Sequence, residues 1–103
     1  MAYHESEGKD IRLKVLYRST TNFLNDYTAN ISIGGCFLST QQAFSMGERI
    51  ELALILPDGR SINATGVVQW ISDDREFPGV GVRFTILSPR DKQLITQLLA
   101  ERE

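Results

Sequence analysis

Two alternating segments on either side of Pro57-Asp58-Gly59 limit most strongly what this chain can fold into. Every second residue is apolar in segment 49–56, and segment 61–72 continues the same two-residue period. Because successive side chains of a strand point to opposite faces, this pattern predicts two strands that are each buried on one side. Asp-Gly between two such segments is a strong signal for a tight hairpin turn. The predicted inward-facing residues are Ile50, Leu52, Leu54, Leu56, Ile62, Ala64, Gly66, Val68 and Trp70.

Four further segments, 11–18, 27–31, 36–39 and 79–86, also show short strand patterns. In the first of them Ile11, Leu13, Val15 and Tyr17 are predicted to face inward, and Arg12, Lys14, Leu16 and Arg18 outward. Gly66 within a strand suggests a bulge, and Gly47 suits a loop position with a positive φ. Six strands at hairpin-like spacing predict a mainly β fold, a small closed antiparallel barrel, because closure removes exposed sheet edges.

A helix is predicted after the last strand. Ser88 is the expected N-cap, with Pro89 at the first helical position and Asp91 three residues after the cap. The apolar stripe of Leu94, Ile95, Leu98 and Leu99 is expected to pack against the barrel. A chain of 103 residues suits one domain. We expect a flexible N-terminal segment over residues 1–10 and a barrel domain with its helix over residues 11–103.

The residues give no support for catalysis or metal binding. The single histidine, His4, lies in the polar N-terminal segment, so no base is expected beside a nucleophile, and we predict a non-enzymatic protein without catalytic residues. Cys36 has no partner for an internal disulfide and is predicted to be a small core residue. The acidic residues Asp73, Asp74 and Glu76 are expected to form a solvated turn, and no metal or cofactor is predicted.

Charge and hydropathy limit the cellular location and the classes of partner that we expect. A formal net charge of −2 gives no basic excess for neutralising phosphates, so nucleic acid is not expected as a partner. The alternative is a barrel that binds single-stranded nucleic acid, which requires exposed aromatic side chains. We expect the candidates for that role, Tyr17, Trp70 and Phe84, to be buried. No apolar run reaches the length of a membrane helix, and the N-terminus lacks an apolar signal segment. We therefore expect a cytoplasmic protein without direct membrane insertion, as the single cysteine also suggests.

The most specific motif is Asn30-Ile-Ser32-Ile-Gly34-Gly35, followed by Phe37 and Leu38. Asn and Ser side chains bond nearby backbone amides and glycines allow tight turns, which accounts for such a sequence in any hairpin. Exposed amides, a hydroxyl and a carboxamide also suit an anionic ligand. The pattern resembles the Asp/Asn-x-Ser-x-x-Gly signature of PilZ domains. The segments 47–52, 56–59, 66–70 and 78–84 resemble further family motifs in the expected order, so the resemblance covers roughly residues 11–100.

The resemblance implies a six-stranded PilZ-like β-barrel with a C-terminal α-helix. Many members of that family bind the bacterial second messenger cyclic di-GMP and relay its level to motility, exopolysaccharide or virulence systems. They bind it with an Arg-x-x-x-Arg pair before the first strand and with the signature turn. In this chain the pair would fall near His4 and Gly8, and neither is arginine.

The missing arginines matter because guanidinium groups pair with phosphates and guanine acceptors and stack on bases. A charge-assisted hydrogen bond contributes roughly 1.5–3 kcal/mol, so losing two costs about 3–6 kcal/mol, on the order of 10²–10⁴ in affinity. Our leading hypothesis is therefore a PilZ-type signalling adaptor with a degenerate binding site. It would act by protein–protein contact in bacterial motility or surface regulation, with weak or no cyclic di-GMP binding.

The expected partner is a protein of a motility or polysaccharide system, and the expected state is a monomer or weak dimer. Candidate contact surfaces are the helix, the connection 23–27 and the basic face of segment 11–18. The alternative hypothesis is a working cyclic di-GMP receptor in which Lys9, Arg12 or Arg18 replaces the usual pair. In that case Asn30 and Ser32 position the ligand, and Gly34 and Gly35 allow close approach of the backbone.

Overall fold

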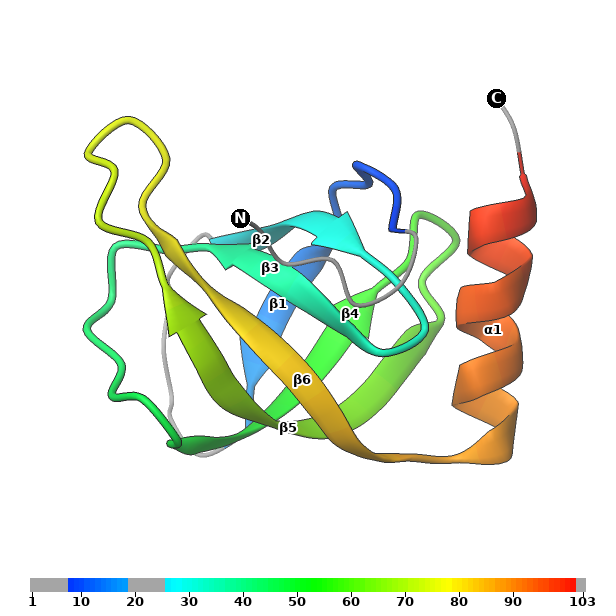
Figure 1. Cartoon of the computed structure of the whole chain (residues 1–103). Helices are drawn as coiled ribbons and strands as arrows, with labels where there is room; N and C mark the ends of the chain where they lie inside the picture. Colours follow the sequence, from blue (N-terminus) through cyan, green and yellow to red (C-terminus); the bar gives the residue numbers. More distant parts are fainter. Residues whose placement is uncertain (1–7, 19–25, 102–103) are drawn as a thin grey trace.

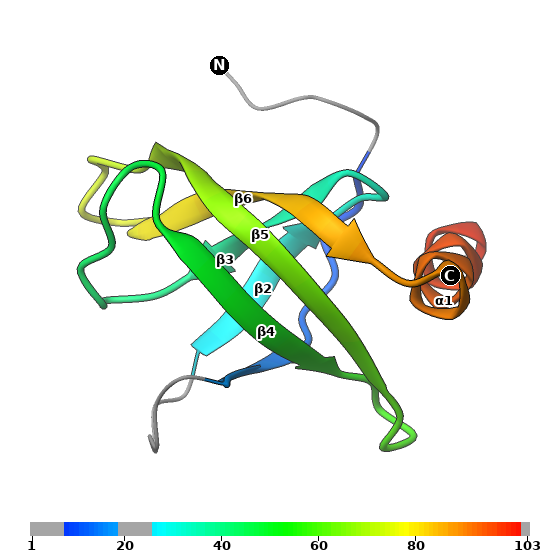
Figure 2. The same ribbon diagram turned by 90° about the horizontal axis from the view of Figure 1, so that it is seen from below.

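The computed structural model describes residues 8–18 and 26–101. Six antiparallel strands form a closed barrel in the order β1-β2-β3-β6-β5-β4, and one helix follows them (Figures 1 and 2). The elements are β1 (Lys14–Tyr17), β2 (Asp26–Ile31), β3 (Gly35–Ser39), β4 (Arg49–Ile55), β5 (Ser61–Ile71), β6 (Gly79–Leu87) and α1 (Pro89–Ala100). The predicted barrel, its six strands and its terminal helix are confirmed.

The central hairpin forms where the sequence predicted it. β4 and β5 pair from Arg49↔Val67 to Ile55↔Ser61. Gly59 adopts a φ of 93°, and its amide donates to the Leu56 carbonyl at 2.9 Å. Gly47 also has the expected positive φ, 83°. The β5–β6 ladder shifts register between Thr65 and Gly66, as expected for a bulge at that glycine.

The first strand is shorter than predicted because a side chain replaces part of its ladder. The Thr28 hydroxyl accepts from the Leu13 amide at 2.9 Å and donates to the Ile11 carbonyl at 2.7 Å. The backbone next to β2 thus stays bonded without regular strand geometry. Further towards the N-terminus, Lys9 and Ile31 exchange two main-chain bonds of 2.9 Å. The expected flexibility of residues 1–10 remains a prediction, since residues 1–7 lie outside the described residues.

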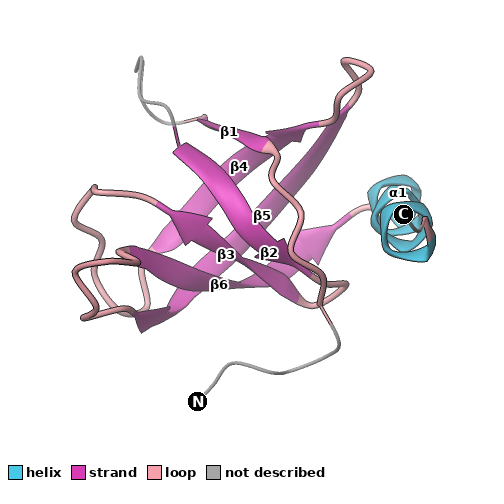
Figure 3. Ribbon diagram, turned by 90° about the horizontal axis from the view of Figure 1, so that it is seen from above, coloured by secondary structure: helices cyan, strands magenta, loops and turns pink. Residues whose placement is uncertain are grey.

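The apolar faces of the strands fill the barrel, and α1 covers one of its ends (Figures 1 and 3). Ser88 is the N-cap, and its hydroxyl accepts from the Asp91 amide at 3.1 Å. The Asp91 carboxylate accepts from the Asn63 amide at 3.3 Å, at a part of β5 that β6 does not pair with. The helix contributes Leu94 and Ile95 to the core, which confirms that its apolar stripe faces the barrel.

Trp70 was predicted to face inward, and this prediction is wrong. Its exposed fraction is 44%, and Ile71 beside it is also exposed. The register of β5 against β6 shifts between Val68 and Trp70, so the alternation that holds from Ile62 to Val68 is interrupted at Gln69. The bulge turns the indole to the outer face of the barrel.

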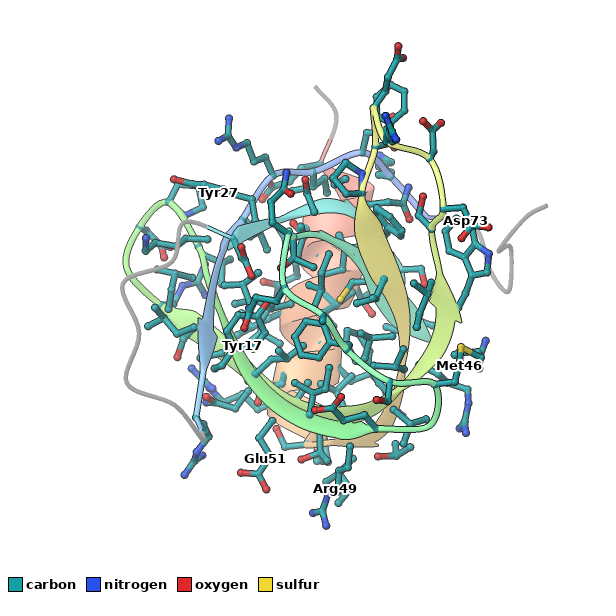
Figure 4. All side chains as sticks on the ribbon, turned by 90° about the vertical axis from the view of Figure 1, so that its left-hand side faces the viewer. Tyr17, Tyr27, Met46, Arg49, Glu51 and Asp73 are labelled. Atoms are coloured by element: carbon teal, nitrogen blue, oxygen red, sulfur yellow. The ribbon has the colours of Figure 1, made fainter. Side chains whose placement is uncertain are left out.

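A buried carboxylate organises the barrel end opposite α1. Asp26 is 6% exposed, and its Oδ2 accepts three bonds: from the Tyr17 hydroxyl and the Thr40 hydroxyl, both at 2.7 Å, and from Gln42 Nε2 at 2.8 Å. The Tyr17 ring packs against Phe44 at 5.9 Å between centroids. Figure 4 looks onto this end and labels Tyr17. One carboxylate therefore ties β1, β2 and the connection after β3 together.

We expect Asp26→Ala to lower the free energy of unfolding by roughly 2–4 kcal/mol, because two hydroxyls and an amide lose their shared acceptor. Urea unfolding followed by circular dichroism measures the change. Asp73→Asn, at an exposed turn, is the control and should stay within about 0.5 kcal/mol of the parent protein. An Asp26→Ala variant as stable as that control would contradict the assigned role.

Candidate functional site

The signature turn joins β2 to β3 and is held by its own serine. Ser32 is 2% exposed, and its Oγ lies 3.2 Å from the Gly34 amide, which donates to it, and 3.3 Å from the Gly35 carbonyl, to which it donates. The Ser32 amide also donates to the Gly35 carbonyl at 2.8 Å. The Phe84 amide donates to the Gly34 carbonyl at 2.9 Å, which fixes the turn to β6. The serine therefore shapes the turn, as the simpler interpretation of the motif proposes.

The glycines of the turn do not need a left-handed backbone. Among the described residues the positive-φ glycines are Gly47, Gly59 and Gly79. Gly35 lies opposite Arg83 in the β3–β6 ladder. The tight turn between Ile31 and Gly35 thus forms without the conformation that only glycine readily adopts.

Asn30 faces the N-terminal segment and is bonded to an acid. Its Nδ2 donates to Asp10 Oδ1 at 3.0 Å. Gly8 packs so closely that an added Cβ would overlap Asn30 Oδ1. The segment expected to carry the arginine pair therefore does lie beside the turn, but in the described part it brings a carboxylate and a glycine there.

Arg12 forms a cationic surface with an aromatic ring on the outside of β2. Its guanidinium carbon lies 3.9 Å from the centre of the Tyr27 ring, and Lys14 Nζ lies 5.8 Å from the same centre. Both distances are within the range of cation–π attraction. Arg12 and Tyr27 line a hollow of about 620 Å³ together with Thr28, Ala29 and Ser39.

Arg18 lies elsewhere. Its Nε is 3.8 Å from Glu51 Oε1, and Arg49 approaches the other oxygen of Glu51 at 3.8 Å. In Figure 4 Glu51 and Arg49 lie across the barrel from Tyr27. The structure therefore does not bring Arg12 and Arg18 together.

Lys9 is directed to the end of the helix. Its Nζ donates to the Glu101 carbonyl at 3.2 Å. The last turn of α1 has no basic residue of its own, so Lys9 places a cation at the negative end of the helix dipole. Lys9 and Arg12 both line a hollow of about 430 Å³ that also contains Asp10 and Glu101, whereas Arg18 lies beside Glu51.

The buried position of Cys36 can be compared with its predicted role. Cys36 is fully buried, and burial raises the pKa of its thiol from 9.0 to about 12, which fits the predicted core role. No three His, Cys, Asp or Glu side chains gather as a metal-ligand group within residues 8–18 and 26–101. His4 and Phe23 lie outside the described residues.

The sequence analysis missed an aromatic surface near the β5–β6 hairpin. The Phe37 and Trp70 rings lie 5.4 Å apart between centroids, and Phe77 in the hairpin is 66% exposed. A signal was present, because the adjacent bulky residues Trp70 and Ile71 cannot both face the core of a regular strand.

The PilZ domain family model matches residues 9–101. Among solved structures, this fold is similar to the Bacillus subtilis Inhibitor of motility (MotI/DgrA), with a TM-score of 0.77 and 22% sequence identity. The match covers 96% of this chain and 50% of that one, so the chain spans about half the length of that structure. At 22% sequence identity this similarity establishes a shared fold and no more. No functionally curated protein matches the sequence. In the part of the chain that the structure describes, α1 falls short of the length and apolarity of a membrane span.

Cys36 should be chemically silent in the folded protein. At neutral pH we expect labelling by an aromatic disulfide reagent to be at least roughly a hundredfold slower than in urea, because the reactive thiolate is both buried and suppressed. Since the folded pKa lies above the unfolded value, the contribution of the thiol to stability is complete below pH 9.0 and is lost as the pH rises towards about 12. Cys36→Ala should weaken this alkaline loss. Equal labelling rates in the folded and unfolded protein would contradict the assignment.

Proposed function

The chain belongs to the PilZ domain family, and from this premise we propose that it is a non-enzymatic signalling adaptor that binds a protein partner and binds cyclic di-GMP weakly or not at all. The observation that carries the proposal is the bond from Asn30 to Asp10 beside the signature turn. A carboxylate occupies the neighbourhood where an anionic dinucleotide would need a cation.

Charge explains why this contact opposes the nucleotide. Two like charges 4 Å apart repel by about 1 kcal/mol in water and by about 4 kcal/mol at the effective dielectric constant of a protein surface. The Ser32 hydroxyl is directed at the backbone of its own turn. The turn therefore keeps its shape while offering little attraction to a phosphate.

The cations near the turn do not supply the attraction for phosphate that an arginine pair would provide. Lys9 would have to leave the Glu101 carbonyl at the end of α1. Arg18 would have to leave Glu51, which lies across the barrel from Tyr27 (Figure 4). These positions of the cations support weak nucleotide binding. They therefore favour an adaptor that signals through contact with a protein partner.

Arg12 favours the second candidate function, a working cyclic di-GMP receptor. Its guanidinium and the Tyr27 ring border a large hollow on the outside of β2, the strand that leads into the turn. In this candidate Arg12 binds a phosphate or stacks on a guanine, Asn30 and Ser32 position the ligand, and Gly34 and Gly35 allow close backbone approach. Arg18, expected from the sequence as another substitute, would take no part.

The process and the location are proposed from the family and from one protein of similar fold. MotI/DgrA, similar in fold, is named an inhibitor of motility. We therefore place this adaptor in the cytoplasm, as a monomer or weak dimer that contacts a component of a motility or polysaccharide system. Binding to nucleic acid and insertion into a membrane are not part of the proposal.

Calorimetric titration with cyclic di-GMP at physiological salt tests the leading proposal. We expect a dissociation constant weaker than roughly 100 μM, because within residues 8–18 and 26–101 Asn30 at the turn is bonded to a carboxylate, not to an arginine. Removing the nearby negative charge with Asp10→Asn should strengthen the residual binding by about tenfold. A micromolar constant for the unmodified protein would reject the proposal.

Two matched arginine variants separate the candidate functions. If the protein is a receptor, Arg12→Ala should weaken nucleotide binding by at least about tenfold, the loss of one charge-assisted contact. Arg18→Ala is the control, since it removes the same charge from the far side of the barrel. Equal effects of the two variants would remove Arg12 as the substitute for the arginine pair.

A further inference from the structure

The most unusual surface of the molecule is an aromatic cleft, which we define by its lining residues Phe37, Trp70, Ser72, Asp73, Asp74 and Phe77. Its volume is about 410 Å³. The exposed fractions of Trp70 and Phe77 are 44% and 66%, which are high for large apolar side chains. In Figure 1 the β5–β6 hairpin that carries Phe77 projects beyond the barrel at the end opposite α1.

Specific backbone features build this cleft. Gly81 lies between Phe37 and Trp70 in the sheet, paired with Phe37 on one side and with Trp70 on the other. Because Gly81 has no side chain, the two rings can approach across it to 5.4 Å. At Gly79 an added Cβ would lie 2.7 Å from the Phe37 ring and would also overlap the Leu38 carbonyl oxygen. Two glycines and the bulge before Trp70 thus hold an aromatic pair on the outside.

The rim of the aromatic cleft is acidic. Asp73 and Asp74 both line it, and the hairpin segment 73–76 holds three carboxylates and one guanidinium. The hairpin is ordered by Asp74, whose Oδ1 accepts from the Glu76 amide at 2.9 Å. Nearby, Arg83 on β6 donates to Gln69 at 3.0 Å and is not among the lining residues. The charged groups that face the cleft are therefore both negative.

These features select among ligand classes. A nucleotide base could stack on the indole, but its phosphates would meet two carboxylates, which repel them. A purely apolar segment would cover the rings but would make no contact with the two carboxylates of the rim. A guanidinium satisfies both parts of the cleft, because it stacks on aromatic faces and its fork of N–H groups matches carboxylates.

We infer that the aromatic cleft binds an arginine side chain presented by an exposed segment of a protein partner. The guanidinium stacks on the exposed face of Trp70 and donates to Asp73 and Asp74, while apolar residues beside the arginine cover Phe77. The inference rests on the proposed adaptor function and specifies its partner as a segment with an arginine between apolar residues. It assigns a partner surface that is separate from the helix and from the basic face of β1.

The test uses fluorescence, because Trp70 is the sole tryptophan of the chain and lies in the cleft. The probe is the capped peptide Ala-Leu-Arg-Leu-Ala, and the matched control peptide has citrulline, a neutral isostere, in place of arginine. We expect a saturable change with the arginine peptide and at least tenfold weaker binding of the citrulline peptide. High salt should weaken binding of the arginine peptide by screening the carboxylates. Equal binding of the two peptides, or no saturable change, would overturn the inference.

Variants of the hairpin test the same contact without disturbing the reporter. The double variant Asp73→Asn/Asp74→Asn should weaken the arginine peptide by at least tenfold. Glu76→Gln removes a charge from the same hairpin, outside the cleft lining, and should change affinity by less than threefold. A Glu76→Gln effect as large as that of the double variant would show a general charge effect and overturn the assigned contact.

Cyclic di-GMP and self-association provide the remaining outcomes. Peptide binding that persists alongside tight nucleotide binding supports the cleft assignment and rejects the proposed function. Absence of both peptide and nucleotide binding overturns the cleft assignment and leaves the proposed function in place. Displacement of the peptide by cyclic di-GMP assigns the cleft to the nucleotide and overturns the inference. Self-association that the double variant abolishes, measured by sedimentation, assigns the cleft to a second copy and also overturns it.

Discussion

The seam between β1 and β2 is the constraint on which the rest of the structure depends. Among the described residues the two strands pair at Lys14↔Tyr27 and Val15↔Asp26, and beyond this short ladder the Thr28 amide donates to the Leu13 carbonyl at 2.9 Å. Side chains complete the seam: the Thr28 hydroxyl bridges two backbone groups on one side, and the Asp26 carboxylate gathers three donors on the other. A barrel that is open at this seam would expose two strand edges and the apolar interior.

The same seam decides what the signature turn can bind. The bonds between Lys9 and Ile31 hold the N-terminal segment along β2, which brings Asp10 to Asn30. This path also carries Lys9 to the end of α1 and leaves Arg12 on the Tyr27 ring. The electrostatics of the turn therefore follow from how the barrel is closed.

The sequence predicted the fold well and the site only in part. Two-residue alternation, Asp58-Gly59 and the Ser88 cap are local signals, and they were sufficient for six strands, the central hairpin and the helix start. The partners of Arg12, Arg18 and Asn30 depend on register between strands distant in sequence, which no local pattern encodes. Trp70 was misplaced for a related reason. Alternation assumes a regular ladder, and the bulge at Gln69 interrupts it, so that Gln69, Trp70 and Ile71 are all exposed.

The filled interior leaves the outer face for recognition. Buried side chains occupy the barrel, α1 covers one end, and Tyr17 and Phe44 pack together at the other. On the outer face polar residues are the rule, so aromatic residues found there call for an explanation. Tyr27 lies under a cation, whereas Phe37 and Trp70 lie beside carboxylates. Because the two aromatic surfaces carry opposite charge, an anionic nucleotide and a cationic side chain would be directed to different faces of the same barrel.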